Sequence, residues 1–197
     1  MFCRFTMKLE TQIEKLAQVG IHLNEGISVE DFLTSFDRND YEESPFGLIL
    51  FVYGIEVEEA PWGRFFCDRA WNFDTECIAS NGDYVSIVQN FHRITGRAKN
   101  LSDVSDQIDI EGGKACLQYK VDGEQKFYDI KVDDDWADPE TVSSIMEDLK
   151  VEGFEFYPKD NGQASIWFYL TPNEAKQLNA IAGNVFNLES KPWWKIW

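Results

Sequence analysis

The chain has 197 residues, of which 44% are hydrophobic and 15% aromatic, so it is long and apolar enough to bury a substantial core. Its net charge of −17 at pH 7 opposes binding to nucleic acid and to anionic membranes, and it favours basic partners. An acidic surface that serves only solubility is the simpler alternative. No stretch approaches the roughly 20 apolar residues of a membrane span, so we expect no membrane partner.

The cysteines and the N-terminal residues indicate a reducing compartment. Cys3, Cys67, Cys77 and Cys116 form no C-x-x-C pair and no zinc-type spacing with histidine, so we expect buried, reduced thiols. The first eight residues contain no long apolar segment of the kind found in secretory signals. We therefore predict a cytoplasmic protein that holds no metal and no other cofactor.

The first half of the chain carries start and stop signals for helices. The predicted helices are 7–19, 28–36, 46–53 and 83–95, with an extended segment at 69–78. The apolar run 46–53 also fits a buried strand. Ser44-Pro45 resembles an N-cap followed by proline at the first helical position, and Gly54 can end a helix, so a buried helix is favoured.

The strongest local signal in the chain is the hairpin around Asp122-Gly123. These residue types suit a type I′ turn, because both of its central positions need φ > 0. The pairs expected to face each other are Leu117 with Tyr128, Ala115 with Ile130, and Tyr119 with Lys126. Opposed residues share a face, so the hairpin has one mostly apolar side. A further strand is expected just before it, at 104–110.

A second hairpin and two capped helices complete the predicted elements. Asp138-Pro139 and Thr171-Pro172 each place a capping residue before a proline that can begin a helix. The second hairpin pairs 154–157 with 164–170 around a three-residue turn that ends at Gly162. The expected facing pairs are Phe154 with Phe168 and Phe156 with Ile166. These strands are either covered on both faces or expose an aromatic strip.

Together these elements predict an α+β fold. A helix-rich N-terminal half precedes a C-terminal half in which an antiparallel sheet forms in the order ββα-ββα. We expect a single domain over residues 1–197. The polar loop 97–102 is the candidate boundary for a subdivision of the chain. It would divide a helical half, 1–96, from a sheet half, 103–190.

No residues form a recognisable catalytic or metal motif. The only histidines are His22 and His92, and neither accompanies a G-x-S-x-G turn or a helix-opening cysteine. The acidic run 133–138 fails the EF-hand pattern, because Asp138 stands where glycine is needed and Ser144 where glutamate is needed. We therefore predict no catalytic residues and favour a protein that is not an enzyme. Because the chain has 35 acidic residues, a catalytic site built from a pair of carboxylates stays an alternative.

The segment 62–74 has the densest mixture of aromatic, charged and amide side chains. Tryptophan and arginine are the types enriched in binding hot spots, and alternating aromatic and acidic groups also suit a carbohydrate or other small ligand. The alternative is that the aromatic residues are core and the charged residues pair with each other. The candidate partner-binding residues are Trp62, Arg64, Asp68, Arg69, Trp71 and Asp74.

The last residues of the sequence form a second aromatic cluster. Trp193, Trp194 and Trp197 fall within five residues, beside lysines and without an acidic side chain. This composition complements the acidic character of the rest of the chain. We expect the tail either to pack on its own domain or to form a homodimer.

The overall profile is similar to that of bacterial immunity proteins that neutralise toxins. Such proteins are small, acidic, cytoplasmic and aromatic-rich, and they lack a catalytic signature. The resemblance is one of class and is carried by no shared motif. It implies a protein-binding module that captures a basic protein. The alternatives are a regulatory module, and an enzyme or small-ligand (carbohydrate-like) binding protein with a cleft around residues 62–74.

Overall fold

The structure is a computed structural model that describes residues 6–162 and 164–188. These residues form seven helices and two antiparallel three-stranded sheets, which confirms the predicted α+β class. The elements are α1 (Leu9–Gln18), α2 (Val29–Phe32), α3 (Arg38–Glu42), α4 (Gly47–Val52), β1 (Ala70–Asp74), α5 (Asp83–Ile94), β2 (Leu101–Asp109), β3 (Lys114–Val121), β4 (Glu124–Ile130), α6 (Pro139–Leu149), β5 (Glu155–Asn161), β6 (Ala164–Leu170) and α7 (Pro172–Ala182). None of the helices in the described residues combines the length and the apolar composition that crossing a membrane requires.

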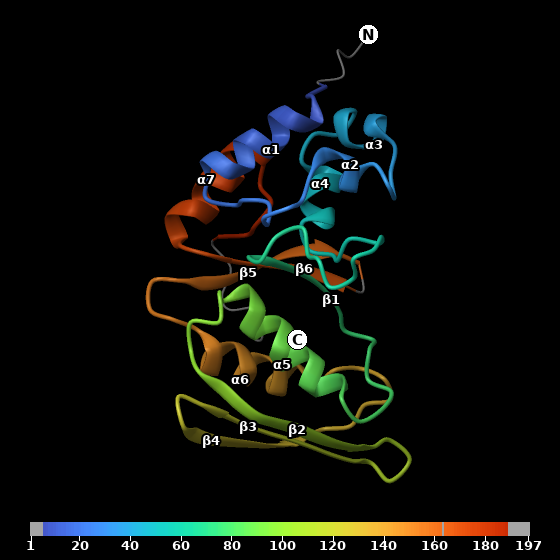
Figure 1. Ribbon diagram of the computed structural model, residues 1–197. Helices are drawn as coiled ribbons and strands as arrows, with labels where there is room; N and C mark the ends of the chain where they lie inside the picture. Colours follow the sequence, from blue (N-terminus) through green and yellow to red (C-terminus); the bar gives the residue numbers. More distant parts are fainter. Residues whose placement is uncertain (1–5, 163, 189–197) are drawn as a thin grey trace.

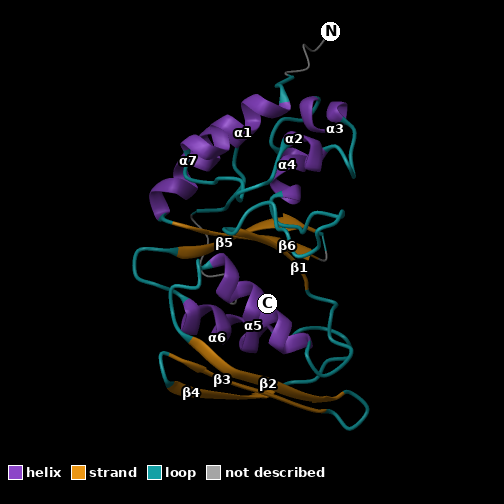
Figure 2. Ribbon diagram, in the orientation of Figure 1, coloured by secondary structure: helices purple, strands orange, loops and turns teal. Residues whose placement is uncertain are grey.

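The elements stack in four layers (Figure 1; Figure 2). One outer layer contains α1 to α4 and α7, and it covers one face of an antiparallel sheet with the strand order β1-β6-β5. Helices α5 and α6 cover the other face of that sheet, and a second antiparallel sheet, β2-β3-β4, forms the far outer layer. The predicted strands of the C-terminal half thus belong to two sheets.

The β1-β6-β5 sheet separates two hydrophobic clusters. Ile166 and Phe168 of its central strand join the cluster with the N-terminal helices, and Trp167 and Tyr169 join the cluster with α5 and α6. This alternation follows from the period of two in a strand. Of the two predicted alternatives for these strands, coverage on both faces is confirmed.

The predicted register of the second hairpin is wrong. Phe156 pairs with Tyr169 and Tyr157 with Phe168, so the pairing is shifted by three residues from the expected one. Strand β5 continues to Asn161, whereas the prediction ended it at Tyr157 and placed Asp160 and Asn161 in the turn. Pro158 is tolerated because β5 is an edge strand, where a missing N–H breaks no ladder hydrogen bond. An odd shift places Phe156 on the opposite face from Phe168.

The register of the first hairpin is confirmed. Leu117 pairs with Tyr128 and Ala115 with Ile130, and the turn residues Asp122 and Gly123 have φ values of 51° and 84°. The inner face of this sheet packs on α5 and α6, whereas its outer face is polar apart from Phe127.

The helix predicted at 46–53 is confirmed, but its predicted start is wrong. Helix α4 begins at Gly47, and Phe46 before it has a left-handed φ of 66°. The buried side chain of Gln12 accepts a hydrogen bond from the Phe46 N–H at 2.8 Å. A contact with α1 therefore holds the backbone here, in place of the expected cap at Ser44.

Both hydrophobic clusters draw residues from each side of the loop 97–102. Strand β1 pairs with β6, and α7 packs with the N-terminal helices. The cluster around α5 likewise includes residues of β3 and α6. The subdivision into 1–96 and 103–190 stays a prediction, and in the described residues the two parts share both cores.

Candidate functional site

Trp62 lies at the tip of a hairpin-like loop between α4 and β1. The loop is closed by an antiparallel bridge between Glu56 and Phe65 and by a 2.7 Å hydrogen bond from the Val57 N–H to the carbonyl of Arg64. Residues 58–63 are exposed. The side chain of Trp62 is 72% exposed, which is the largest value among the exposed large hydrophobic residues of the described chain.

Arg64 fixes the shape of this loop. Its Nη1 donates to a carboxylate oxygen of Asp31 at 2.9 Å, and its Nε donates to the carbonyl of Pro61 at 3.1 Å. Burial raises the pKa of Asp31, but hydrogen bonds from Ser28 and Arg64 outweigh this effect and lower it below its ordinary value. Asp31 belongs to α2, so the ion pair ties the loop to the helical layer.

The surroundings of Trp62 are acidic. Glu58 and Glu59 are exposed beside it, and the Glu56 carboxylate accepts a hydrogen bond from the Gly63 N–H. The single positive side chain of the loop, Arg64, is already paired with an acid. The loop therefore presents an indole within a negative field, which suits a basic partner.

Arg69 is partly buried, and its side chain is engaged within the fold. Its Nη1 and Nη2 donate to both carboxylate oxygens of Glu174, at 2.7 and 2.8 Å, while Nη1 also donates to the carbonyl of Gly20 and Nη2 to that of Tyr169. The Glu174 carboxylate also accepts from the Thr171 N–H in the capping box of α7. Burial raises the pKa of Glu174, but the hydrogen bonds from Arg69 and Thr171 outweigh this and lower it to about 2. We call this group the Arg69–Glu174 clamp.

Asp68 takes part in a second internal arrangement, centred on Arg93 of α5. Arg93 is only 5% exposed, and its guanidinium donates to the carbonyls of Cys67 at 3.1 Å and Ala70 at 3.2 Å. It lies 3.7 Å from the ring centre of Phe65 and 3.4 Å from an oxygen of Asp68. Burial lowers the pKa of Arg93, and the charge of Asp68 partly offsets this. No sequence pattern indicated this role, because Arg93 falls between apolar positions of α5.

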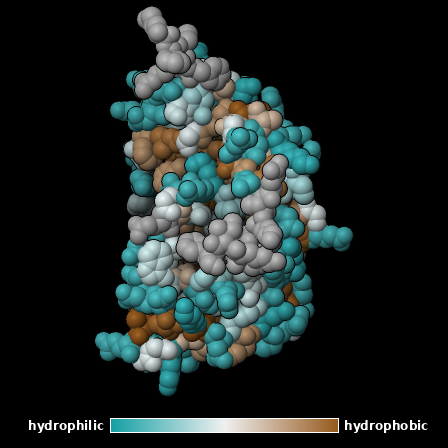
Figure 3. Space-filling model, turned by 180° about the vertical axis from the view of Figure 1, so that it is seen from behind, coloured by the Kyte–Doolittle hydropathy of each residue, from teal (hydrophilic) through white to brown (hydrophobic). Residues whose placement is uncertain are grey.

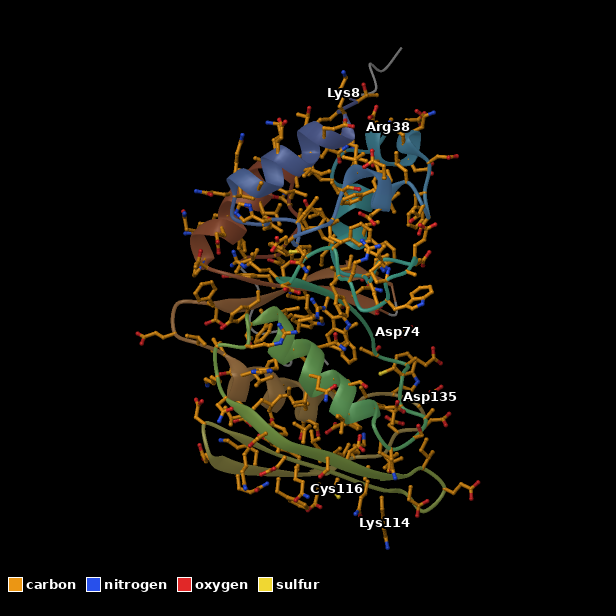
Figure 4. The ribbon with its side chains drawn as sticks, viewed as in Figure 1. Lys8, Arg38, Asp74, Lys114, Cys116 and Asp135 are labelled. Atoms are coloured by element: carbon orange, nitrogen blue, oxygen red, sulfur yellow. The ribbon has the colours of Figure 1, made fainter. Side chains whose placement is uncertain are left out.

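Trp71 and Asp74 both belong to β1 but have different environments. Trp71 stacks on Phe73, with 4.8 Å between ring centres, and its edge meets Phe91 at 5.0 Å. Asp74 is exposed at the end of the strand, on the flank that also carries Asp135 (Figure 4). The six predicted partner-binding side chains are therefore not gathered at one place, and Trp62 is the most exposed aromatic residue among them.

A cavity of about 730 Å³ lies near that flank, between the β1-β6-β5 sheet and the start of α6. Its apolar lining includes Phe73, Trp136, Val142, Pro158 and Trp167. Its acidic lining residues are Asp133, Asp138 and Asp160. Asp138 is engaged as the N-cap of α6, because its carboxylate accepts from the N–H and the hydroxyl of Thr141. The lining residues come from distant parts of the sequence, so local patterns did not reveal the cavity.

The two histidines occupy separate environments. His92 Nε2 lies 2.8 Å from the carbonyl oxygen of Lys99, and His22 is exposed. Across residues 6–162 and 164–188, no three side chains of His, Cys, Asp or Glu gather as a metal-binding group. The absence of catalytic residues stays a prediction.

The surface and the tail bear on the remaining predictions. Hydrophilic residues cover much of the face seen in Figure 3, where hydrophobic residues form separate patches. The predicted self-association residues Trp193, Trp194 and Trp197 lie outside the described residues.

Comparisons of the chain with protein-family models, with curated proteins and with solved structures found no match.

Proposed function

We propose that the protein is a binding module that captures a basic protein through the loop around Trp62. The observation that carries this proposal is the 72% exposure of Trp62 at the tip of an ordered acidic loop. A large indole left in water is unfavourable for an isolated chain, and its burial by a partner removes that cost. Tryptophan anchors of this kind commonly contribute about 2 kcal/mol or more to binding when fully desolvated.

The order of the loop supports the same function. Arg64 ties the tip to α2 through Asp31 and to its own chain through the Pro61 carbonyl. A loop held in its binding conformation before the encounter loses less conformational entropy when the partner arrives. Arg64 then acts as a positioning residue.

Charge supplies the second part of the recognition. The net charge of −17 attracts a basic protein over distances comparable to the Debye length, about 8 Å at physiological salt. The glutamates around Trp62 extend this field to the binding loop itself. This combination of electrostatic attraction and an aromatic anchor is the behaviour that the resemblance to toxin-neutralising immunity proteins implies.

The test compares Trp62→Ala with Phe127→Ala. Phe127 is a matched control because it is an aromatic residue with 57% exposure on β4 of the far outer sheet, whereas the Trp62 loop precedes β1 of the inner sheet. Tagged full-length chains of each variant are used to isolate partners from cells of the source organism, and the affinity of each isolated protein is measured.

The proposal expects a basic protein that binds the unchanged chain and Phe127→Ala equally and binds Trp62→Ala about 30-fold more weakly or worse. Its association rate should fall as salt rises from about 0.05 to 0.5 M, while its dissociation rate changes less. A partner that is retained equally by Trp62→Ala, or an association rate independent of salt, would contradict the proposal.

A further inference from the structure

The cavity beside α6 is separate from the Trp62 loop, because no residue of that loop is among its lining residues. Its volume of about 730 Å³ is within the range of ligand-binding pockets, and its wall is formed by aromatic and aliphatic side chains such as Phe73, Trp136 and Trp167. Three acidic residues, Asp133, Asp138 and Asp160, and one basic residue, Lys131, also line it, so its charged side chains are mainly acidic. An occupant that matches this surface is aromatic and carries positive charge.

We propose that this cavity receives the C-terminal segment of its own chain, residues 189–197. That segment contains three tryptophans together with Lys191 and Lys195, and its single acidic side chain is Glu189. The indoles match the apolar wall, and the lysines match Asp160, whereas Asp133 already lies 3.8 Å from Lys131. The charge of the cavity and the charge of the segment are therefore complementary.

The place where the described chain ends agrees with this assignment. After α7, Phe186 packs against Tyr157 of β5, with 5.4 Å between ring centres, and Asn179 holds its backbone through two hydrogen bonds of 2.8 and 2.9 Å. Tyr157 lies on one face of β5, whereas the adjacent Pro158 lines the cavity. The chain thus leaves the described fold beside the strand that forms part of the cavity wall.

The path from the end of the described chain to the cavity runs around one strand. Strand β5 is the edge of its sheet, so a segment can pass from one face to the other around a single strand, whose width is about 5 Å. A smaller hollow lined by Asp160, Gly183 and Val185 already connects the end of α7 with β5. Nine extended residues span up to about 30 Å, which is several times the width of one strand.

The first experiment measures hydrogen exchange of the backbone amides of 189–197 in the full-length chain. We expect exchange at least ten times slower than in a free peptide of the same sequence. Trp136→Ala, which removes one wall of the cavity, should abolish this protection. Trp62→Ala is the matched control, because it removes an exposed tryptophan that does not line the cavity, and it should leave the protection unchanged. Equal protection in the Trp136→Ala chain, or none in the unchanged chain, overturns the proposal.

The second experiment identifies whose segment occupies the cavity. A labelled peptide of residues 189–197 is added to the unchanged chain and to a full-length variant with Trp193, Trp194 and Trp197 replaced by serine. The peptide should bind the variant at least tenfold more tightly, because the cavity of the unchanged chain is already filled. Light scattering should give a monomer for both chains. A dimer that dissociates in the triple variant would place the segment on a second copy of the chain. Equal or absent peptide binding would show that the cavity takes another ligand. Each of these results refutes the assignment of the segment to the cavity of its own chain. Circular dichroism confirms that every variant is folded.

Discussion

Replacing Glu174 by glutamine should destabilise the fold by an amount that depends on pH. The carboxylate receives two hydrogen bonds from Arg69 and one from the Thr171 N–H. Glutamine keeps an oxygen for the Thr171 N–H but loses the negative charge beside Arg69. The clamp connects α7 to the start of β1 and to Gly20, which follows α1. Its loss should therefore destabilise the packing of the whole helical layer.

The size of the effect follows from the pKa of Glu174. That pKa is lowered from 4.5 to about 2 in the folded chain, and such a difference corresponds to about 3 kcal/mol of stability at pH 7. The folded pKa is depressed, so this stabilisation is present above pH 4.5 and is lost as the pH falls towards 2. At pH 3 about 1 kcal/mol should remain.

Urea denaturation at pH 7 and at pH 3, followed by tryptophan fluorescence, gives the free energy of unfolding of the unchanged chain and of Glu174→Gln. We expect the difference between the two chains to shrink by roughly 2 kcal/mol on acidification, because the other carboxylates titrate alike in both. Glu147→Gln is the control, since Glu147 forms a half-exposed pair with Lys150 that contributes at most about 1 kcal/mol. A difference for Glu174→Gln that stays constant between the two pH values would falsify the assigned cause of the low pKa.

Substitutions at two further positions test the turn and the buried arginine. Gly123→Val should lower the free energy of unfolding by about 2 kcal/mol and Gly123→Asn by much less, because φ is 84° there and asparagine tolerates the left-handed region; equal urea midpoints for the two variants would argue against a backbone origin. Arg93→Met should cost about 2–4 kcal/mol because it leaves the carbonyls of Cys67 and Ala70 without their donor. Arg93→Lys should recover part of that loss, and a melting temperature of Arg93→Met equal to that of the unchanged chain would show that these bonds are unimportant.

The features that were predicted correctly are determined by residues that lie close together in the sequence. Asp122-Gly123 sets the first hairpin through its own φ values, and Thr171 caps α7 through Glu174 three residues later. The second hairpin was predicted less well, because Asp160 and Asn161 are common turn residues that here extend an edge strand. Their preference for turns was outweighed by pairing with β6, a contribution that local patterns do not contain.

Long-range pairing also explains which candidate residues reach the surface. Trp62 and Trp71 have the same side chain and lie nine positions apart, so composition alone treats them alike. Ala70 and Trp71 pair with Phe168 and Trp167, almost 100 residues away, and this pairing places Trp71 against the rings of α5 and β1. Trp62 belongs to a loop that no strand covers.

The same reasoning separates the two arginines that the sequence grouped together. Arg69 directly precedes β1, and Glu174 and two backbone carbonyls occupy the N–H donors of its guanidinium. A partner could bind these donors only by opening the clamp. Arg64 stays in the loop, and its pairing with Asp31 leaves the surrounding glutamates without a neutralising charge. A segment rich in tryptophan and arginine therefore supplies both internal contacts of the fold and one exposed indole. We therefore predict that the glutamates around Trp62 recognise the positive charge of the proposed partner. The arginines should affect binding only through the shape of the loop.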